Sequence, residues 1–303
     1  MTPISKNNMI SVIIPFYNEK KNLPVLLDKL TREFKGLKKT FEIVLVDDGS
    51  NDGGSLLIKE SAEVKMVRHR KRFGKGQALK TGLDASKGDI IVFMDADLQN
   101  DPKDLSKMLE KLDQGFDLVN GIRTPRHSEN LILGSYSFFA EKLLKTFLES
   151  PYSDINCGFK VFRRKVLSGF VFYGNNFRFF PLGVFYAGYK VTELPVTNNP
   201  RLHGKSKFGP GKLMVGIFDT MTAYFIYKFA ERPLHFFGPI GGALFFAGFA
   251  VSLYLTVERL FFQVLLVNRP LLWLGVLLII IGIQVTMTGI IGELVVYINK
   301  KKE

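Results

Sequence analysis

Two acidic residues one position apart are the strongest candidates for chemistry in this chain. Asp95 and Asp97 stand in the sequence D-A-D-L-Q, directly after the apolar run 90–94. Two carboxylates with this spacing point the same way only where the chain leaves the regular pleat of a strand. They then offer oxygen ligands for Mg²⁺ or Mn²⁺, which would bridge a diphosphate and neutralise charge on a leaving nucleotide. For a D-x-D sequence alone, an ordinary polar turn is the alternative.

Polar residues also follow two earlier apolar runs. One run ends at Pro15 and leads into F-Y-N-E, and the other ends at Asp47 and leads into D-G-S-N-D. Carboxylates at these places suit a base-and-ribose pocket, because they accept hydrogen bonds from ring N–H groups and ribose hydroxyls. A pair of ordinary turns is the alternative, since Asp-Gly and Asn-Glu are good turn formers.

A glycine-containing segment, G-K-G-Q-A at Gly74–Ala78, opens a predicted helix. Small residues there permit close approach of a ligand, and a helix N-terminus favours anions. The segment is not a P-loop, because the spacing G-x-x-x-x-G-K-[ST] is absent. The basic run Arg68–Arg72 just before it is either a solvated edge or a phosphate contact.

Short apolar runs alternate with helical patterns in the first half of the chain. Strands are predicted at 10–15, 41–47, 64–68, 89–94 and 117–121, and helices at 21–34, 53–62 and 75–86. This alternation predicts an α/β fold with a doubly wound, mostly parallel sheet. Ligands bind beyond the carboxyl ends of the strands in such sheets, which is where the candidate residues stand. Later in the chain, the patterns predict a helix at 131–148, strands at 158–162 and 190–196, and a loop at 198–211.

Two long apolar segments follow, at 234–257 and 271–292. Each exceeds the roughly 20 residues needed to cross a bilayer. The preceding segment has large apolar residues at helical spacing, which predicts an interfacial amphipathic helix, with a buried core helix as the alternative. We therefore expect a catalytic domain at 1–211, an interfacial helix at 212–232 and a transmembrane hairpin with a basic tail at 233–303. Gly238 and Gly242 have a G-x-x-x-G spacing that supports helix packing, either within the hairpin or in a homo-oligomer.

The net charge of +13 suits either nucleic acid or an anionic membrane surface. We favour the lipid bilayer and expect no nucleic acid partner, because two candidate spans follow the basic region. Lys and Arg are concentrated on the outer flanks of the hairpin, so the positive-inside rule predicts that both termini and the catalytic domain are cytoplasmic. Residues 1–9 contain no apolar stretch of signal-peptide type, so internal segments are expected to direct insertion. The sole cysteine, Cys157, excludes an intramolecular disulfide.

In their order along the chain, the first segments resemble glycosyltransferase family 2. The matching residues are Ser11–Glu19 (S-V-I-I-P-F-Y-N-E), Val46–Asp52 (V-D-D-G-S-N-D), Gly74–Gly82 (G-K-G-Q-A-L-K-T-G) and Asp95–Gln99 (D-A-D-L-Q). The resemblance implies the Rossmann-like GT-A fold, a nucleotide-sugar donor and an inverting transfer. Later segments resemble the dolichyl-phosphate mannose and glucose synthases and their bacterial polyprenyl-phosphate relatives. These are G-I-R at 121–123, D-I-N-C-G-F-K at 154–160, R-F-F-P at 178–181, G-K-S-K-F-G at 204–209 and the R-P-L that leads into the hairpin.

The resemblance assigns roles on the donor side. Residues expected to hold the nucleotide-sugar are Pro15, Tyr17, Glu19, Asp47, Asp48, Lys75 and Asp95. Residues expected to serve the metal and the diphosphate are Asp95, Asp97 and Gln99, with Asp97 counted as catalytic.

The resemblance also assigns acceptor residues. Arg123 and Ser135 stand where relatives bind the acceptor phosphate. Arg201 and Lys205 lie on a loop that would close over the phosphates. The alternative is that this loop is solvated and faces the membrane. Relatives often carry an Arg shortly before the Ser, whereas here the preceding residues are apolar. Arg126 or Lys142 would then substitute.

Physical reasoning supports a lipid phosphate as the acceptor. Such a phosphate is already anionic near neutral pH, so it needs positive charge to position it and no strong base to activate it. Arg provides this charge through a bidentate fork. Asp154 matches the position of a catalytic base or orienting carboxylate in relatives; the alternative is that it holds a nearby Arg or loop. A structural salt bridge between Arg123 and Asp154 is one such arrangement.

The sequence thus predicts transfer of one sugar from a nucleotide-sugar to a polyprenyl phosphate. UDP-glucose is favoured as donor because the D-x-x-C-G-F-K run resembles the glucose synthases. One rival is a processive polysaccharide synthase, but its Q-x-x-R-W motif is missing, since the only Trp is Trp273. The other rival is a non-catalytic membrane scaffold, against which the presence of Asp95, Asp97 and Arg123 argues.

Overall fold

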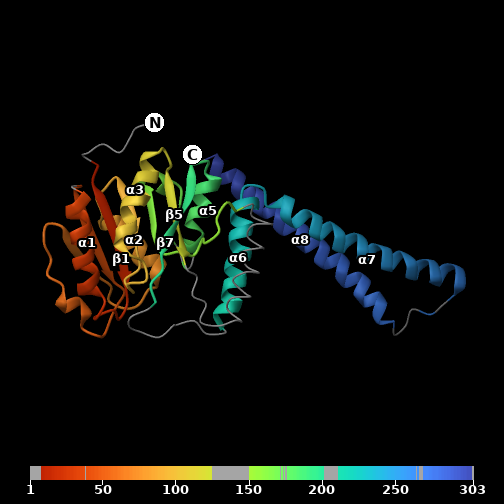
Figure 1. Cartoon of the computed structure of the whole chain (residues 1–303). Coiled ribbons are helices and arrows are strands. Elements are labelled where there is room, and N and C mark those ends of the chain that lie inside the picture. Colours follow the sequence, from red (N-terminus) through yellow and green to blue (C-terminus); the bar gives the residue numbers. More distant parts are fainter. Residues whose placement is uncertain are drawn as a thin grey trace. The chain divides into compact units, whose positions relative to one another are not determined.

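The computed structural model describes residues 8–37, 39–124, 150–170, 172, 174, 176–200, 211–263, 265 and 269–301. The chain forms two compact units, Met1–Thr220 and Met221–Glu303 (Figure 1). The first unit is built on a β-sheet, and the second is dominated by two long helices. The boundary between the units falls inside helix α6 (Gly211–Phe229), in the segment where an interfacial helix is predicted. The domain limits from the sequence stay a prediction.

Seven strands form one mixed sheet in the first unit. They are β1 (Ile10–Phe16), β2 (Phe41–Asp47), β3 (Val64–Arg68), β4 (Ile90–Phe93), β5 (Leu118–Thr124), β6 (Lys160–Arg163) and β7 (Val191–Thr197). The order across the sheet is β3-β2-β1-β4-β6-β5-β7. β6 pairs antiparallel with both β4 and β5, whereas the other neighbouring strands pair in parallel. The predicted mostly parallel α/β sheet is confirmed.

Helices cover both faces of this sheet. They are α1 (Leu23–Leu37), α2 (Lys75–Ala85), α3 (Leu105–Asp113) and α5 (Phe180–Tyr186). Successive side chains of a strand point to opposite faces. Accordingly, Val12 and Ile14 of β1 lie in one core cluster with the apolar faces of α1 and α3. Ile13 lies on the other face, against α2, where a Cβ added to Gly82 would come 2.3 Å from its Cγ2 atom.

The helix predicted at 53–62 is wrong. The structure has only a short 3₁₀ turn, η1 (Gly54–Leu57), and the chain is extended again at Ile58. Gly53 has φ 72°, a left-handed conformation that does not continue into a helix. The carboxylate of Asp52 accepts hydrogen bonds from the N–H groups of Lys20 and Gly54, at 2.8 and 2.9 Å. These bonds tie the turn to the loop after β1.

The other strands and helices predicted within the described residues lie close to observed ones. The structure also contains elements that were not predicted. Helix α3 follows the D-A-D-L-Q segment, and α5 follows the 3₁₀ turn η4 (Asn176–Phe179); the sequence analysis assigned neither. Two further 3₁₀ turns are η2 (Pro102–Asp104) and η3 (Arg164–Leu167). The helix predicted at 131–148 and most of the loop predicted at 198–211 lie outside the described residues.

A buried polar network closes the sheet at the end where β1 and β2 begin. The Ser11 hydroxyl donates to Glu42 Oε1 at 2.7 Å and accepts from the Gly88 N–H at 2.7 Å. Lys65 Nζ donates to Glu42 Oε2 at 2.6 Å. Burial would raise the pKa of Glu42, but these partners hold it below its usual value. The carboxylate therefore stays ionised inside the sheet.

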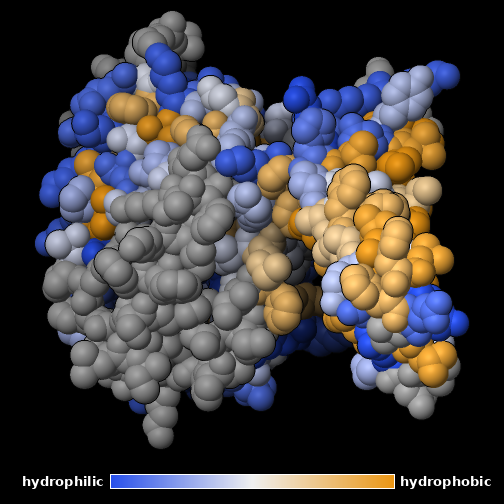
Figure 2. All heavy atoms as spheres, turned by 90° about the vertical axis from the view of Figure 1, so that its right-hand side faces the viewer, coloured by the Kyte–Doolittle hydropathy of each residue, from blue (hydrophilic) through white to orange (hydrophobic). Residues whose placement is uncertain are grey.

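The second unit is an antiparallel pair of apolar helices, α7 (Leu234–Phe262) and α8 (Pro270–Lys300). They have 29 and 31 residues and a mean hydropathy of 1.9 and 2.4 in their most apolar stretches. At 1.5 Å per residue, each is about 44 Å or longer, enough to cross a hydrocarbon layer of about 30 Å. Apolar side chains such as Phe246, Trp273 and Ile291 are exposed. Figure 2 shows apolar residues gathered on the surface of this part of the molecule. Both helices indicate association with a membrane.

Glycines allow the two helices to approach each other closely. A Cβ on Gly282 of α8 would lie 2.5 Å from the backbone nitrogen of Phe245, and one on Gly248 of α7 would lie 2.6 Å from the carbonyl oxygen of Gly275. The predicted pair Gly238 and Gly242 does not hold the hairpin together. A Cβ added to Gly242 would meet no atom of another described element within 4 Å, and one added to Gly238 would meet only Leu234 of its own helix. That part of the prediction is wrong, because this pair lies to one side of the seam.

We expect one added methyl group to have opposite effects on and off this seam. Gly282→Ala places a Cβ against backbone atoms that cannot rotate away, so it should destabilise the hairpin by about 1–3 kcal/mol. Gly242→Ala should be neutral or stabilise by about 0.5–1 kcal/mol, because alanine loses less backbone entropy in a helix. Thermal unfolding of both variants in detergent measures the difference. Equal midpoints for both would contradict the observed seam.

Candidate active site

The reversed direction of β6 brings separate segments to one edge of the sheet. β1, β2, β4 and β5 all end at this edge, and β6 begins there because it is antiparallel to β4 and β5. The loop that precedes β6 therefore meets the loops that follow the parallel strands. Ligands of doubly wound sheets bind at this edge.

The D-A-D-L-Q segment turns sharply at the end of β4. The strand ends at Phe93, and Leu98 has φ 61°, a left-handed conformation that is rare for a bulky residue. The Gln99 N–H donates to Asp97 Oδ1 at 3.2 Å, and the Gln99 carbonyl accepts from the Asn199 N–H at 2.7 Å. The prediction that the chain leaves the pleat at the two carboxylates is confirmed.

Asp95 forms an ion pair with Lys75, at the start of α2. Burial would raise the pKa of Asp95, but the Lys75 ammonium holds it below its usual range, so the carboxylate is ionised. Gly158 lies against the same carboxylate, where an added Cβ would come 2.2 Å from Asp95 Oδ2. Lys75 and Asp95 line an open cavity together with Lys160 and Arg178. Three cations and one carboxylate make this cavity suited to anions.

The predicted nucleoside residues after β2 are engaged by their own chain. Asp48 accepts hydrogen bonds from the N–H groups of Phe73 and Gly74, at 2.8 and 2.9 Å, and lies 3.0 Å from a His69 ring nitrogen. Asp47 accepts from the Ser50 N–H at 2.7 Å. Both carboxylates thus shape the loops of this edge, and their contact with a nucleoside stays a prediction.

The residues after β1 lie beside this pair of loops. The Arg72 guanidinium lies over the Tyr17 ring, 4.4 Å from its centroid, and Glu19 accepts a hydrogen bond from the Asn22 side chain at 2.6 Å. Pro15 is within β1, in register with Val46. Arg72 of the basic run before α2 thus contacts a predicted site residue, and a phosphate contact of this run stays a prediction.

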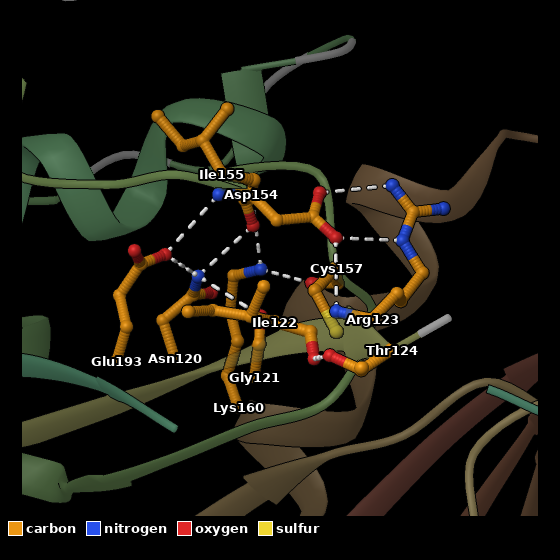
Figure 3. Close-up of polar contacts among 10 residues, drawn as sticks. All are labelled: Asn120, Gly121, Ile122, Arg123, Thr124, Asp154, Ile155, Cys157, Lys160 and Glu193. Carbon is orange, nitrogen blue, oxygen red and sulfur yellow. Dashed lines mark hydrogen bonds and ion pairs between the residues drawn. The ribbon is translucent and has the colours of Figure 1, made fainter. Parts of the chain in front are cut away.

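Arg123 and Asp154 form a bidentate ion pair (Figure 3). Arg123 Nε donates to Asp154 Oδ2 at 2.8 Å, and Nη2 donates to Oδ1 at 2.9 Å. These hydrogen bonds hold the pKa of Arg123 above its usual value, so the guanidinium stays charged. The Arg123 side chain remains 41% exposed, whereas that of Asp154 is 5% exposed. The salt bridge considered from the sequence is present, and it leaves part of the guanidinium accessible to an anion.

Two residues near this pair, the half-buried Glu193 and the buried Asn120, were not identified as site residues from the sequence. Glu193 of β7 accepts hydrogen bonds from the N–H groups of Ser153 and Asp154, and Asn120 of β5 donates to both Glu193 and the Asp154 carbonyl. The signal that marks each of them is a polar residue within a predicted strand. Lys160, which the sequence placed only within a motif, donates to the carbonyls of Ile155 and Cys157.

Three predicted acceptor residues, Ser135, Arg201 and Lys205, lie outside the described residues, as do the possible substitutes Arg126 and Lys142. The structure therefore brings together the carboxylate turn, the start of α2, Arg123 and Asp154. Cationic and anionic side chains are paired there, Lys75 with Asp95 and Arg123 with Asp154.

The chain belongs to glycosyl transferase family 2, whose model matches residues 11–170. It is a glycosyltransferase with the GT-A fold. A protein of Rhizobium johnstonii named dodecaprenyl-phosphate galacturonate synthase is 29% identical over 94% of this chain and 87% of its own length. A protein of Pseudomonas paraeruginosa named undecaprenyl-phosphate 4-deoxy-4-formamido-L-arabinose transferase is 30% identical over 94% of this chain and 84% of its own length.

Solved structures share the fold at lower sequence identity. Glucosyl-3-phosphoglycerate synthase from Mycobacterium tuberculosis superposes with a TM-score of 0.57 at 20% identity, over 73% of this chain and 80% of that one. A second structure of that enzyme, with a TM-score of 0.56 at 18% identity and the same coverage, contains Mn²⁺, UDP and glucosyl-3-phosphoglycerate.

Burial of Lys160 should give the protein a measurable pH dependence. Burial lowers the pKa of Lys160 from 10.5 to about 8. Between these values the unfolded chain binds more protons than the folded chain, so the free energy of unfolding should rise with pH. The contribution of this one group is at most about 3 kcal/mol.

Lys160→Met should remove this rise. The measurement is denaturant unfolding of metal-free protein in detergent at pH 8, 9 and 10. Lys107→Met, at a lysine that is 67% exposed, is the control and should keep the wild-type pH dependence. The same rise in the Lys160→Met protein would show that this lysine is not the cause.

Proposed function

We propose that this chain transfers one sugar from a nucleotide-sugar to a polyprenyl phosphate at a membrane surface. The observation that carries the proposal is the extent of the similarity. The relatives named for dodecaprenyl and undecaprenyl phosphate match 94% of this chain, so the match includes the apolar hairpin as well as the sheet. An acceptor with a long apolar tail must be used where the tail is solvated, and the hairpin supplies that location.

The sequence and the two relatives point to different sugars on the donor. The sequence favours UDP-glucose, whereas the two relatives are named for galacturonate and 4-deoxy-4-formamido-L-arabinose. We therefore propose a panel of radiolabelled donors that includes UDP-glucose and UDP-galacturonate, tested with undecaprenyl phosphate. Label in organic-extractable lipid supports the proposal, insoluble polymer indicates a processive synthase, and no transfer from any donor rejects it.

The proposed reaction needs few proton transfers. An oxygen of the lipid phosphate attacks the anomeric carbon, and the bond between that carbon and the diphosphate breaks from the opposite side. The nucleoside diphosphate leaves with the bonding electrons, and the anomeric configuration inverts. Arg123 would hold the attacking phosphate with the part of its guanidinium that Asp154 leaves exposed, and Asp154 would keep that guanidinium in place.

The carboxylate turn fits a divalent metal that arrives with the diphosphate. No group of three or more His, Cys, Asp or Glu side chains forms a ready metal site in the described part of the chain. Mg²⁺ and similar ions, however, are commonly held by one or two carboxylates together with substrate phosphates. Asp95 is ionised, and the lack of a side chain at Gly158 lets its carboxylate lie against that residue. Asp95 and Asp97, with Gln99 near them, would hold the ion, which would offset the charge on the departing diphosphate.

We also propose that the basic flanks of the hairpin and the catalytic unit lie on the cytoplasmic side of the inner or plasma membrane. The excess of Lys and Arg on these flanks supports this orientation. Labelling of a cysteine added to the C-terminal tail, in a Cys157→Ser background, would show the opposite orientation if an impermeant reagent reached it from outside.

Metal removal should abolish the transfer. Asp97→Asn should lower the rate by about 100-fold or more with the fold retained, because it removes a charged metal ligand. Asp101→Asn is the matched control, since this nearby carboxylate caps η2 by accepting from the Lys103 N–H. Radiolabel transfer with and without excess chelator measures both effects. Full activity in chelator would reject a metal role.

Replacement of Arg123 should impair use of the lipid phosphate and spare the donor. Arg123→Ala should lower kcat/KM for polyprenyl phosphate by about 10- to 100-fold, because a charge-assisted contact is lost. Binding of the nucleoside diphosphate should change by less than about twofold on this reasoning. Arg123→Lys should restore activity only in part, since it keeps the charge and loses the fork.

Calorimetry for the nucleotide and kinetics for the lipid phosphate separate these effects. Arg32→Ala is the control, because Arg32 forms an exposed ion pair with Asp28 elsewhere on the surface. Equal losses for both substrates, or a loss of thermal stability alone, would mean that Arg123 has only a structural role.

A further inference from the structure

We propose that Glu193 is a positioning residue for the transfer, which acts through Asp154 by fixing the backbone of the loop 153–158. This inference rests on the proposed function, because it concerns the rate of that reaction. Neither Glu193 nor its partner Asn120 belongs to the motifs that the sequence analysis identified. Both lie next to the Arg123–Asp154 ion pair (Figure 3).

The carboxylate of Glu193 accepts hydrogen bonds from the backbone at the start of the loop. Its Oε2 atom accepts from the Ser153 N–H at 2.6 Å, and its Oε1 atom accepts from the Asp154 N–H at 3.2 Å. The Asn120 amide donates to Glu193 Oε1 at 3.0 Å and to the Asp154 carbonyl at 2.9 Å. The backbone of Asp154 is thereby held at both its N–H and its carbonyl.

An ammonium group holds the far end of the same loop. Lys160 Nζ donates to the Ile155 carbonyl at 3.2 Å and to the Cys157 carbonyl. The loop thus directs N–H groups at a carboxylate and carbonyl groups at an ammonium. The negative carboxylate faces the positive N–H ends of the peptide dipoles, and the positive ammonium faces their negative carbonyl ends. Both contacts therefore favour the same backbone conformation.

The strands that carry these residues provide a rigid reference. Asn120 and Glu193 are directly opposite each other in the parallel pairing of β5 with β7. Arg123 is on β5 as well, three residues beyond Asn120. The same strand pair therefore sets the place of the Asp154 backbone and the place of its ion-pair partner. A shift of the loop by a fraction of an ångström would lengthen the charged hydrogen bonds of 2.8 and 2.9 Å that orient Arg123.

The substitution Glu193→Gln keeps the shape and replaces an acceptor oxygen by an NH₂ group. This group cannot accept from a backbone N–H or from Asn120, so at least one donor loses its partner. We expect kcat to fall about tenfold or more, and KM for the nucleotide-sugar to stay within about twofold. If Glu193 only supported the fold, its substitution would instead lower the thermal stability and the fraction of active protein. The kcat of each folded molecule would then stay unchanged.

The chain offers a matched control for this substitution. Glu42 is also a strand carboxylate with several hydrogen-bond donors; it is buried and located where β1 and β2 begin, away from the site. Glu42→Gln should lower the unfolding midpoint and leave kcat per folded molecule unchanged.

The decisive experiment is a double-mutant cycle on the full-length protein in detergent, with Glu193→Gln and Asp154→Asn. If Glu193 acts through Asp154, the second substitution should add less than about twofold to the loss caused by Asp154→Asn alone. Multiplied losses, or wild-type kcat in Glu193→Gln, would overturn the inference. A wild-type protein that transfers no sugar from any donor would instead reject the proposed function.

Cys157 gives a second readout that does not depend on activity. It is the only cysteine of the chain, is buried, and lies in the loop, with its N–H donating to the Asp154 carbonyl at 3.2 Å. The thiol is fully buried, so its labelling requires opening of the loop, and burial also raises its pKa. A thiol reagent should label Glu193→Gln faster than wild type, and Glu42→Gln at the wild-type rate, well below their unfolding midpoints. Unchanged labelling of Glu193→Gln overturns the inference even if Asp154→Asn leaves too little activity for the cycle.

Discussion

Because β6 runs against both of its neighbours, the loop that leads into it begins where β4 and β5 end. This one reversal places Asp154 beside Arg123, and Gly158 against Asp95. A parallel strand at the same place would have carried the loop to the opposite edge of the sheet. Most residues proposed to hold the donor follow parallel strands, whereas Arg123 and Asp154, proposed for the acceptor, meet only because of this reversal.

The strongest charges of the site already have partners within the chain. Asp95 is paired with Lys75, and Arg123 with Asp154. Half-buried ions without partners would be costly, so such pairs keep the charged groups in place before any ligand binds. An incoming phosphate then meets charged groups that are already oriented, and the site does not have to recruit a charge from solvent. This order favours binding that is specific more than binding that is tight.

The sequence predicted the sheet and the carboxylate turn because these features depend on local patterns. Continuous apolar runs define the buried strands, and the D-A-D spacing is informative only at the end of such a run. The failures have physical causes as well. The segment after Asp52 has a helical composition, but a left-handed glycine and two side-chain hydrogen bonds hold it as a turn. Glu193 gained its partners only from tertiary structure, since the loop that it holds is forty residues away in sequence.

The same reasoning applies to the hairpin. A G-x-x-x-G spacing is visible in the sequence, but which face of a helix meets its neighbour depends on the partner helix. The observed seam uses Gly275, Gly282 and Gly289, spaced seven residues apart on α8. A repeat of seven matches the left-handed crossing of two long helices, and a spacing of four does not by itself select it.

The order of the elements along the chain has a consequence for biosynthesis. β7 is the last strand of the sheet and ends at Thr197, and the first apolar helix begins at Leu234, which is 37 residues later. At about 5–20 residues per second, translation crosses this interval in roughly 2–7 s. All seven strands therefore exist before the ribosome has made any part of the hairpin. Pairing of the sheet can proceed in water on the nascent chain, and insertion into the bilayer then tethers a unit whose strands have already met.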